Sequence, residues 1–574
     1  MSAETGDAVS AAAGRTGDQD VPVLEVRGLQ VAYRTEGELK TVLHGDSFTI
    51  EPGERVAVVG ESGSGKSTTA SAVLGLLPGS GRITGGQVLF KGEDITAPSP
   101  ARLARLRGRE IGLVPQDPMS NLNPVLKVGR QVAETLVAHG LATGAAARER
   151  AVELMGEAGI PDAARRARQY PHEFSGGMRQ RVLIAIGLAC EPELLIADEP
   201  TSALDVTVQR QILDHLESLR AARGTSLMLI THDLGLAADR ADKVLVMSAG
   251  RIVEAGPAAE ILRRPQAEYT RRLVAAAPSV ATARAQFGSG AHAAPATAEA
   301  SRPRSIGVPD ESVLDAKNLT KQYRLRGHRG QHITAVDDIS FTVRRGSTTA
   351  IVGESGSGKT TTAQMVLGLE KPTAGEVHVN GEVVETARGA QRRAIRRAMQ
   401  PVFQDPYGSL NPTFSIEHIV DEPLRVFRVG DRRSRRRRVG ELLDQVSLPH
   451  AIAQRRPNEL SGGQRQRVAI ARALALDPQI VVCDEAVSAL DVLVQDQTLS
   501  LLRDLQSRLG LTYLFITHDL AVVRLIAEQV LVMKQGKVVE AGAVDDVFDA
   551  PQTAYTQALL QAIPGAEFFA EHAS

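Results

Sequence analysis

The chain carries nearly the same nine-residue loop twice, and this repeat constrains its fold more than any other feature. Residues 60–68 read GESGSGKST and residues 353–361 read GESGSGKTT, 293 positions apart (353 − 60). Other motifs recur at an offset of 286, among them SGG at 175 and 461. Small loop insertions account for the drift in offset. The pattern indicates duplication of a whole domain of roughly 250 residues, far longer than a solenoid repeat.

Length and composition agree with two large domains. A chain of 574 residues exceeds what one hydrophobic core usually serves. The formal net charge of −1 gives no general attraction to nucleic acid or to anionic membranes. No stretch resembles a signal peptide or approaches the ~20 apolar residues that cross a bilayer, so any membrane role is expected to be peripheral. Cys190 and Cys483 lie in or beside apolar stretches and are expected to be buried thiols.

The domain boundaries follow from composition. The stretch between the repeats is rich in Ala, Pro, Gly and Ser without apolar periodicity, which is typical of a flexible linker. The opening residues have the same character. We expect an N-terminal disordered tail at 1–20, a first domain at 21–275, a linker at 276–312, a second domain at 313–564 and a C-terminal tail at 565–574.

Within each repeat, short β-branched runs alternate with helical patterns. RVAVVG at 55–60 predicts a buried strand that stops at glycine, and KSTTASAVLGLL at 66–77 has apolar residues at helical spacing. Residues 194–198 and 226–231 predict further strands, separated by an amphipathic helix at 207–223. Such alternation predicts an α/β fold with a largely parallel sheet and crossover helices.

Both glycine-rich loops fit the pattern G-x-x-x-x-G-K-[ST] between a strand and a helix. Glycines let backbone N–H groups turn onto phosphate oxygens, and the helix N-terminus adds its positive dipole end. Lys66 and Lys359 are predicted to reach the β- and γ-phosphates of ATP, while Ser67 and Thr360 bind Mg²⁺. The predicted ATP-binding residues of the loops are Gly60, Ser62, Gly63, Ser64, Gly65, Lys66, Ser67, Thr68, Gly353, Ser355, Gly356, Ser357, Gly358, Lys359, Thr360 and Thr361.

Each repeat also has an apolar strand that ends in an Asp-Glu pair. Asp198 and Glu199 end LLIADE, and Asp484 and Glu485 end IVVCDE. Alone, such a pair is usually a solvated strand terminus. Its recurrence alongside a phosphate loop favours function: the aspartate holds Mg²⁺, and the glutamate orients or deprotonates the attacking water.

The stretches FSGGMRQRV and LSGGQRQRV resemble the signature loop of ATP-binding-cassette (ABC) ATPases. With the phosphate loops, the Asp-Glu pairs and the THD histidines, the resemblance covers nearly all of residues 23–275 and 313–564. It implies two tandem P-loop domains of the ABC type. Each would have a RecA-like, mostly parallel sheet core, an antiparallel β subdomain and a helical signature subdomain. It further implies that ATP lies between the phosphate loop of one domain and the signature loop of the other.

The resemblance assigns roles residue by residue. Asp205 and Asp491 resemble the loop aspartates that link the two sites. Tyr33 and Tyr323 resemble the aromatic residue that stacks on adenine, although a tyrosine there can also simply pack in a core. The implied catalytic residues are Glu199, Glu485, His232, His518, Gln116 and Gln404. The implied metal ligands are Ser67, Gln116, Asp198, Thr360, Gln404 and Asp484. The implied signature contacts to ATP are Ser175, Gly176, Gly177, Ser461, Gly462, Gly463 and Gln464.

Three departures from the family pattern matter. Met178 replaces the usual Gln of the signature, and EAVSALD replaces EPTSALD in the second repeat. Neither removes a group that must hold phosphate, metal or water, so two hydrolysis-competent sites are expected. First-half relatives often carry a cysteine-rich C-terminal segment for an iron–sulfur cluster; neither cysteine of this chain lies there, so no such cluster is expected.

The segments after Gln116 and Gln404, QDPMSNLNP and QDPYGSLNP, closely resemble ATPases of oligopeptide/dipeptide/nickel importers, as do the repeated tails PQAEYTRRL and PQTAYTQAL. The resemblance implies two separate permease subunits, an extracellular solute-binding protein acting indirectly, and a place on the cytoplasmic face of the membrane. The alternative is a soluble tandem ATPase acting on ribosomes or nucleic acid. Its one candidate patch is RRSRRRR at 432–438, for which a solvated helical face is the other interpretation.

Overall fold

The computed structural model describes residues 21–35, 37–201, 204–277, 311–324, 332–488 and 490–565. The expected tail at 1–20, most of the expected linker and residues 566–574 lie outside the described residues. The chain divides into two compact units. The first unit is Met1–Ala203, Ile212–Thr231 and Arg240–Ala267, and the second is Leu204–Gln211, His232–Asp239 and Glu268–Ser574.

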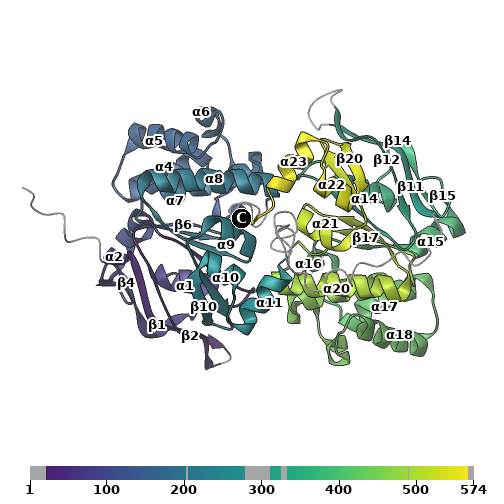
Figure 1. Ribbon diagram of the computed structural model, residues 1–574, viewed down its shortest axis with the longest axis horizontal. Coiled ribbons are helices and arrows are strands. Elements are labelled where there is room, and N and C mark those ends of the chain that lie inside the picture. Colours follow the sequence, from purple (N-terminus) through teal and green to yellow (C-terminus); the bar gives the residue numbers. More distant parts are fainter. Residues whose placement is uncertain are drawn as a thin grey trace, which may run out of the picture. The chain divides into compact units, whose positions relative to one another are not determined.

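The first unit contains two sheets. A four-stranded antiparallel sheet has the order β2-β1-β4-β5, and a six-stranded sheet has the order β10-β9-β3-β8-β7-β6. Strands β9, β3, β8, β7 and β6 pair in parallel, and β10 joins the edge antiparallel. The purple strands labelled β1, β2 and β4 in Figure 1 belong to the antiparallel sheet. The bounds are β1 Leu24–Thr35, β2 Glu38–Ile50, β3 Arg55–Val59, β4 Arg82–Phe90, β5 Glu93–Asp94, β6 Ile111–Val114, β7 Leu194–Asp198, β8 Ser226–Thr231, β9 Lys243–Ser248 and β10 Arg251–Pro257.

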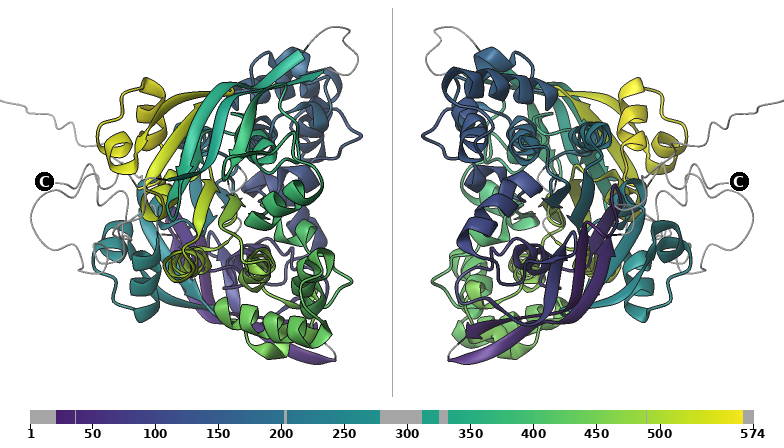
Figure 2. Two further views of the ribbon diagram at one scale, coloured as in Figure 1. Left: turned by 90° about the vertical axis from the view of Figure 1, so that its right-hand side faces the viewer. Right: turned by 90° about the vertical axis from the view of Figure 1, so that its left-hand side faces the viewer.

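The second unit repeats this topology. Its antiparallel sheet has the order β12-β11-β14-β15, and its main sheet has the order β16-β17-β18-β13-β19-β20 with only β20 antiparallel. The long paired strands β11 and β12 stand out in teal in the left view of Figure 2. The bounds are β11 Ser312–Arg324, β12 His332–Arg344, β13 Thr348–Val352, β14 Ala374–Val379, β15 Glu382–Val383, β16 Met399–Val402, β17 Ile480–Asp484, β18 Thr512–Ile516, β19 Gln529–Lys534 and β20 Lys537–Ala543.

Helices connect the parallel strands in both repeats, as strand-to-strand crossovers require, and two further helices follow the last strand of each repeat. In the first repeat they are α1 Lys66–Val73, α2 Pro100–Arg105, α3 Pro118–Asn121, α4 Val128–Ala138, α5 Gly144–Glu157, α6 Ala163–Arg166, α7 Gly176–Leu188, α8 Val206–Arg223, α9 Leu234–Arg240, α10 Ala258–Arg263 and α11 Glu268–Ala276. In the second they are α14 Lys359–Val366, α15 Gly389–Ala398, α16 Pro406–Ser409, α17 Ile416–Phe427, α18 Arg432–Gln445, α19 Gly462–Leu474, α20 Val492–Leu509, α21 Leu520–Ile526, α22 Val544–Asp549 and α23 Ala554–Gln561.

The strand register brings the predicted site residues to one sheet edge. In the first unit Val58 and Asp198 both lie opposite Ile230, so β3 and β7 end level with each other on either side of β8. In the second unit Asp484 and Ile351 lie opposite Ile516 in the same way. Ligands of open parallel sheets bind at the carboxyl ends of the strands. The fold class predicted from the sequence is confirmed, including the antiparallel sheets.

The helix predicted at 66–77 is shorter than expected. Helix α1 ends at Val73, and Gly75 takes a positive φ of 61°. The N–H of Leu76 then bonds to the carbonyl of Ser71 at 2.7 Å, a Schellman-type ending. Leu76 and Leu77 continue the apolar spacing of the helix in the sequence, but they lie beyond its last residue. Because the glycine supplies the left-handed conformation at no steric cost, the chain leaves the helix there.

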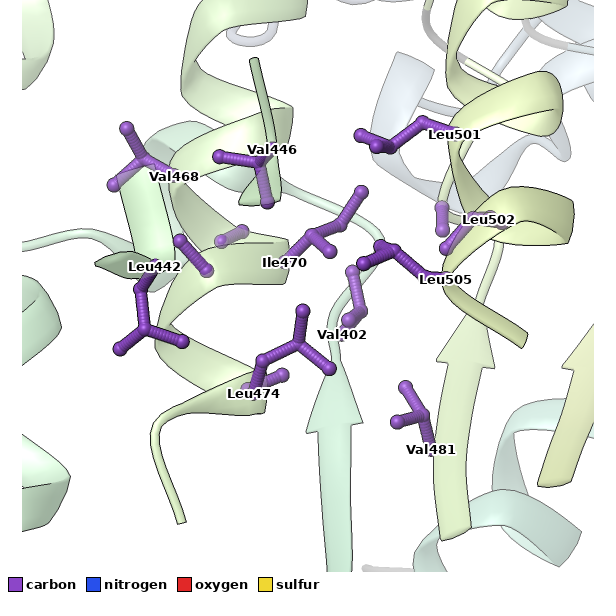
Figure 3. Close-up of a cluster of buried hydrophobic side chains, with 14 of the residues drawn as sticks. Val402, Leu442, Val446, Val468, Ile470, Leu474, Val481, Leu501, Leu502 and Leu505 are labelled. Carbon is purple, nitrogen blue, oxygen red and sulfur yellow. The ribbon is translucent and has the colours of Figure 1, made fainter. Parts of the chain in front are cut away.

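The largest hydrophobic cluster of the second unit lies among α17, α18, α19, α20 and the main sheet. Figure 3 shows side chains from α19 and α20, including Ile470, Leu474 and Leu505, converging with Val402 and Val481 of the sheet. Each of these five is at most 3% exposed. This packing fixes the helical subdomain, and with it the start of α19, to the sheet that carries the Asp-Glu pair.

Replacing Leu505 with Ala is expected to lower the free energy of unfolding by about 2–5 kcal/mol, because a buried leucine is replaced by a cavity. Leu509 is the matched control: it lies one turn further along α20 and is 45% exposed. Urea denaturation of both variants measures the difference. Equal losses in L505A and L509A would contradict this account of the core.

Candidate active site

The two phosphate loops have the same internal hydrogen bonds. The Lys66 ammonium donates to the carbonyls of Gly60 at 2.7 Å and Glu61 at 2.9 Å. Lys359 makes the equivalent pair of bonds in the second repeat, at 2.7 and 2.8 Å. Both lysines are buried. A buried ammonium held by carbonyl dipoles is positioned to meet an anion at the start of a helix, where backbone N–H groups are unpaired.

The loop glycines have distinct physical tasks. A Cβ at Gly60 would lie 2.2 Å from the carbonyl oxygen of Met247, so no side chain fits between the loop and β9. Gly63 and Gly356 have positive φ of 81° and 79°, and a Cβ there would meet nothing within 4 Å. The loop therefore packs closely behind Gly60 and is open in front of Gly63. An open cradle of this kind fits a phosphate group.

Two buried hydroxyls inside the loops support this fit. The Oγ atoms of Ser64 and Ser357 are buried and find no hydrogen-bond partner among the described residues. Buried polar groups are rarely left unpaired, and an exception asks for an explanation. A phosphate oxygen would supply the missing acceptor.

The aspartates at the strand ends have the surroundings of cation ligands. Ser67 donates its hydroxyl to Asp198 at 3.2 Å. Burial, together with the charge of Glu485, raises the pKa of Asp484 to about 6. Its Oδ1 is buried and has no hydrogen-bond partner among the described residues. Hydroxyl and carboxylate oxygens are the ligands that Mg²⁺ prefers, and a cation would offset both the burial and the negative neighbour.

Each predicted glutamine bonds directly to the predicted glutamate of its own repeat. Gln116 Nε2 donates to Glu199 Oε2 at 2.8 Å, and Gln404 Nε2 donates to Glu485 Oε2 at the same distance. Both glutamates adopt left-handed backbone conformations, with φ of 44° and 48°. Such conformations are strained for a residue other than glycine and cluster at functional sites. The sequence predicted these residues, but neither the direct bond nor the strained backbone.

His518 joins this cluster in the second repeat. Its Nδ1 lies 3.2 Å from Glu485 Oε1. Burial works to lower the pKa of His518, but the hydrogen bond and charge of Glu485 raise it overall. Burial also works to raise the pKa of Glu485, and the bond to His518 and its charge lower it overall. The pair therefore favours a charged glutamate beside a charged imidazole. His232 follows β8 at the equivalent position of the first repeat.

The signature serines cap helices, and their contact with ATP stays a prediction. Ser175 precedes α7 and accepts a bond from the N–H of Met178 at 3.3 Å. Ser461 precedes α19 and accepts from the N–H of Gln464 at 3.3 Å, while Gln464 Oε1 accepts from the N–H of Ser461 at 3.1 Å. The second repeat thus has a complete capping box, and Met178 leaves the first with half of one. This is the structural consequence of the departure seen in the sequence.

The loop aspartates also serve as helix caps. Asp205 accepts a bond from the N–H of Val208 at the start of α8, at 3.0 Å. Asp491 accepts from the N–H of Val494 at the start of α20, at 3.1 Å. Each aspartate thus has a structural role as the N-cap of a helix in its own repeat. The linking role that the resemblance implied stays a prediction.

The two tyrosines predicted to stack on adenine differ in their surroundings. Tyr33 packs partly against the hydrophobic core of the first unit. Tyr323 is 38% exposed, and the Lys321 ammonium lies 5.0 Å from its ring centroid. Tyr323 therefore presents more free ring surface than Tyr33. The stacking role stays a prediction for both.

The arginine-rich run at 432–438 forms the first half of α18, and four of its six arginines lie near acids. Arg435 contacts Asp421 at 2.9 Å, and Arg438 contacts Asp477 at 2.5 Å. Arg436 and Arg437 lie 3.4 and 3.9 Å from glutamate oxygens. Carboxylates therefore offset much of the positive charge. This arrangement favours the interpretation as a solvated helical face over a nucleic-acid patch.

The sequence interpretation did not single out the residue after the first loop glycine. The carbonyls of Glu61 and Glu354 accept the bonds from Lys66 and Lys359 described above, and they also accept the N–H groups of Ser64 and Ser357 at 3.1 and 3.2 Å. The signal was present in the repeated letters GES of both loops. The repeat of this glutamate does not by itself indicate the contact, because every residue type has a backbone carbonyl that could accept these bonds.

Together, the strand–loop–helix cradle, the buried lysine and the Asp-Glu pair define a P-loop nucleoside triphosphatase. The family comparison narrows this class. The ABC transporter family matches residues 43–202 and 336–488, and the family described as "Oligopeptide/dipeptide transporter, C-terminal region" matches residues 253–304 and 539–571. The chain belongs to the ABC transporter family, as a tandem ATPase with two ATP-binding cassettes.

Three relatives align along nearly the whole chain. The oligopeptide transport ATP-binding protein OppD of Mycobacterium tuberculosis is 44% identical, covering 95% of this chain and 98% of its own. The glutathione import ATP-binding protein GsiA of Salmonella typhimurium is 41% identical, covering 95% and 90%. The peptidoglycan transport ATP-binding protein YejF of Agrobacterium fabrum is 44% identical, covering 94% and 96%.

Exchanging the signature residues between repeats is expected to exchange their capping. Gln464→Met should speed hydrogen exchange at the N–H of Ser461, because that N–H loses its acceptor, by about five-fold for one net hydrogen bond. Met178→Gln should slow exchange at the N–H of Ser175 by a similar factor. Mass spectrometry of the nucleotide-free full chain measures both, and each variant serves as the control for the other. Unchanged exchange in both would contradict the assigned caps.

Proposed function

We propose that this chain is the ATP-hydrolysing subunit of an importer, and that it couples ATP binding and hydrolysis to uptake of a peptide or a related small solute through two separate permease subunits. The observation that carries the proposal is the duplicated site. Each repeat holds its glutamate by the same 2.8 Å bond from a glutamine, next to a complete phosphate loop. The relatives' names and the match to the oligopeptide/dipeptide transporter C-terminal region support the import role.

Each complete ATP site, in this proposal, takes its parts from both repeats. The packing within the second repeat supports this: α19, which begins at the signature, packs on α17, α18 and β16, whereas α14, which begins at the phosphate loop, packs on β12, β17 and β18. Site one would combine Lys66, Ser67, Gln116, Asp198, Glu199 and His232 with Ser461, Gly462 and Gly463. Site two would combine Lys359, Thr360, Gln404, Asp484, Glu485 and His518 with Ser175, Gly176 and Gly177.

The residues of one cassette divide the chemistry among them. The glutamate accepts a proton from the attacking water, whose oxygen bonds to the γ-phosphorus as the bond to the ADP oxygen breaks, giving ADP and phosphate. The lysine and the loop N–H groups stabilise the negative charge that moves onto the leaving oxygen. Mg²⁺, held by Ser67 and Asp198 or by Thr360 and Asp484, would supply further charge neutralisation when bound. The glutamine keeps the glutamate oriented.

The segment after Gln116 is the proposed contact with a permease helix. Met119 and Val125 in this segment are 64% and 75% exposed, so the segment offers apolar surface to a partner. A groove of about 1350 Å³ lies between α4 and α5, lined by apolar residues such as Val137 and Val152 and by charged rims. Lys127, which lines the groove, follows Val125 by two residues, so a partner helix seated there would adjoin this segment.

The proposed solute class follows from what the solutes in the relatives' names share. Oligopeptides, glutathione and peptidoglycan all contain amide-linked amino acids, so a short peptide or a peptide-containing solute is proposed. An extracellular binding protein would select it, and the chain would work at the cytoplasmic face of the membrane. No helix among the described residues is both long and apolar enough to cross a bilayer.

Glu199→Gln and Glu485→Gln are each expected to abolish most ATP turnover and peptide uptake. A general base contributes about 10²–10⁴-fold to rate, and both sites act in one closing assembly. Turnover is measured on the purified chain, and uptake of a labelled di- or oligopeptide in a deletion strain carrying each variant. Glu191→Gln is the matched control, since Glu191 also has a positive φ, 51°, but is exposed and outside the site. A near-wild-type rate from either site variant would contradict two competent sites. If the unaltered chain hydrolyses ATP but does not restore peptide uptake to the deletion strain, the proposed solute class is wrong.

The head-to-tail arrangement predicts which changes damage the same site. Lys66→Ala and Ser461→Arg are both expected to reduce photolabelling of the first repeat by azido-ATP, because both belong to site one. Ser175→Arg is the control and should reduce labelling of the second repeat instead. Labelled peptides are assigned by mass spectrometry. Loss of label in the second repeat of the Ser461→Arg variant would overturn the arrangement.

A further inference from the structure

The C-terminal helix α23 contacts the phosphate loop of the second repeat. Its Tyr555 hydroxyl accepts a hydrogen bond from the backbone N–H of Glu354 at 3.2 Å. Tyr555 is half-buried, and Glu354 directly follows the first loop glycine. The match to the oligopeptide/dipeptide transporter C-terminal region includes Tyr555 but gives it no task.

Glu354 is the residue on which the loop's internal bonds converge. Its carbonyl accepts the Lys359 ammonium at 2.8 Å and the N–H of Ser357 at 3.2 Å. Its own backbone N–H donates to the Tyr555 hydroxyl. The Tyr555 hydroxyl therefore contacts the same residue whose carbonyl positions the phosphate-binding lysine.

The tyrosine is itself held firmly in place. The Lys534 ammonium, at the end of β19, lies 4.5 Å from the Tyr555 ring centroid. Glu540 of β20 accepts bonds from the N–H groups of Gln552 and Thr553 at 2.8 and 3.1 Å, which anchors the start of α23 to the sheet. A side chain fixed at both its ring and its helix can orient a neighbouring peptide, whereas a mobile one cannot.

The protonation state of the phenol suits this contact. Burial raises the pKa of Tyr555 to about 12, and the charge of the Glu354 carboxylate adds to the increase. The hydroxyl thus keeps its proton at neutral pH while it accepts from the N–H of Glu354.

We propose that Tyr555 is a positioning residue of the second ATP site, where it holds the Glu354 peptide in the orientation that presents Lys359 to the nucleotide phosphates. This inference rests on the loop being an ATP site and not on the solute or the permeases. It joins the C-terminal extension to the nucleotide chemistry.

Tyr555→Phe tests the proposal, because it removes the hydroxyl and keeps the ring under Lys534. It is made in the otherwise unchanged full chain, because Glu199→Gln would itself remove most of the turnover to be measured. The KM for ATP is expected to rise about five-fold, the worth of one net hydrogen bond, with kcat changed far less. Hydrogen exchange at the Glu354 N–H should become faster by a similar factor.

Tyr513→Phe in the same background is the matched control. Tyr513 lies in the core of the same unit and donates its hydroxyl to the carbonyl of Leu502 at 2.9 Å, away from the loop. It should leave the KM for ATP and the exchange at Glu354 unchanged. An unchanged KM in Tyr555→Phe, or an equal rise in both variants, would overturn the positioning role. Since the assay contains only the chain and ATP, its failure would leave the import proposal standing, and failed peptide uptake would leave this result standing.

Discussion

The burial of one lysine ammonium inside each phosphate loop is the interaction on which the rest of the site depends. Lys66 and Lys359 are buried, and desolvation lowers the pKa of Lys359 against the opposing charges of Glu485 and other carboxylates. A buried charge is costly unless dipoles or counter-charges surround it. The loop meets that demand by turning two carbonyls inward, and the turn is possible because Gly353 and Gly358 have positive φ of 148° and 104°. The strand before the loop and the helix after it fix where this turn can occur.

The duplication lets the two sites be compared within one molecule. Distances set by the loop sequence itself agree within 0.1 Å, as the lysine bonds of 2.9 and 2.8 Å to Glu61 and Glu354 show. The glutamine–glutamate bond and the strained glutamate backbone are also repeated. The repeats differ at the signature cap, where Met178 stands in place of Gln464, and around the tyrosine pair, where Tyr33 packs partly against the core and Tyr323 is exposed. The two cassettes therefore share the geometry at the phosphates and diverge around it.

Much of the fold could be predicted from the sequence, because its strands and helices follow a local rule. The structure also brings together the predicted phosphate-loop serine and aspartate of the first repeat, and the predicted glutamine and glutamate of both, while their roles at ATP stay predictions. The strands at 194–198 and 226–231 and the helix at 207–223 follow from apolar periodicity, and the structure has them at β7, β8 and α8. The ending of α1 could not be placed from periodicity, since Gly75 and not an apolar residue decides it. The bonds from Gln116 to Glu199 and from Tyr555 to Glu354 join residues 83 and 201 positions apart, so only the folded chain reveals them. The repeated tyrosine in both tails was the one available hint.

The separation between Glu354 and Tyr555 has a consequence for how the protein is made. The loop is synthesised 201 residues before the hydroxyl that supports it. At a synthesis rate of about 5–20 residues per second, the second phosphate loop waits roughly 10–40 s for its last contact. The second phosphate loop therefore gains this contact only after Tyr555 has been translated. A ribosome that stopped before Tyr555 would release a chain whose second phosphate loop lacks this support.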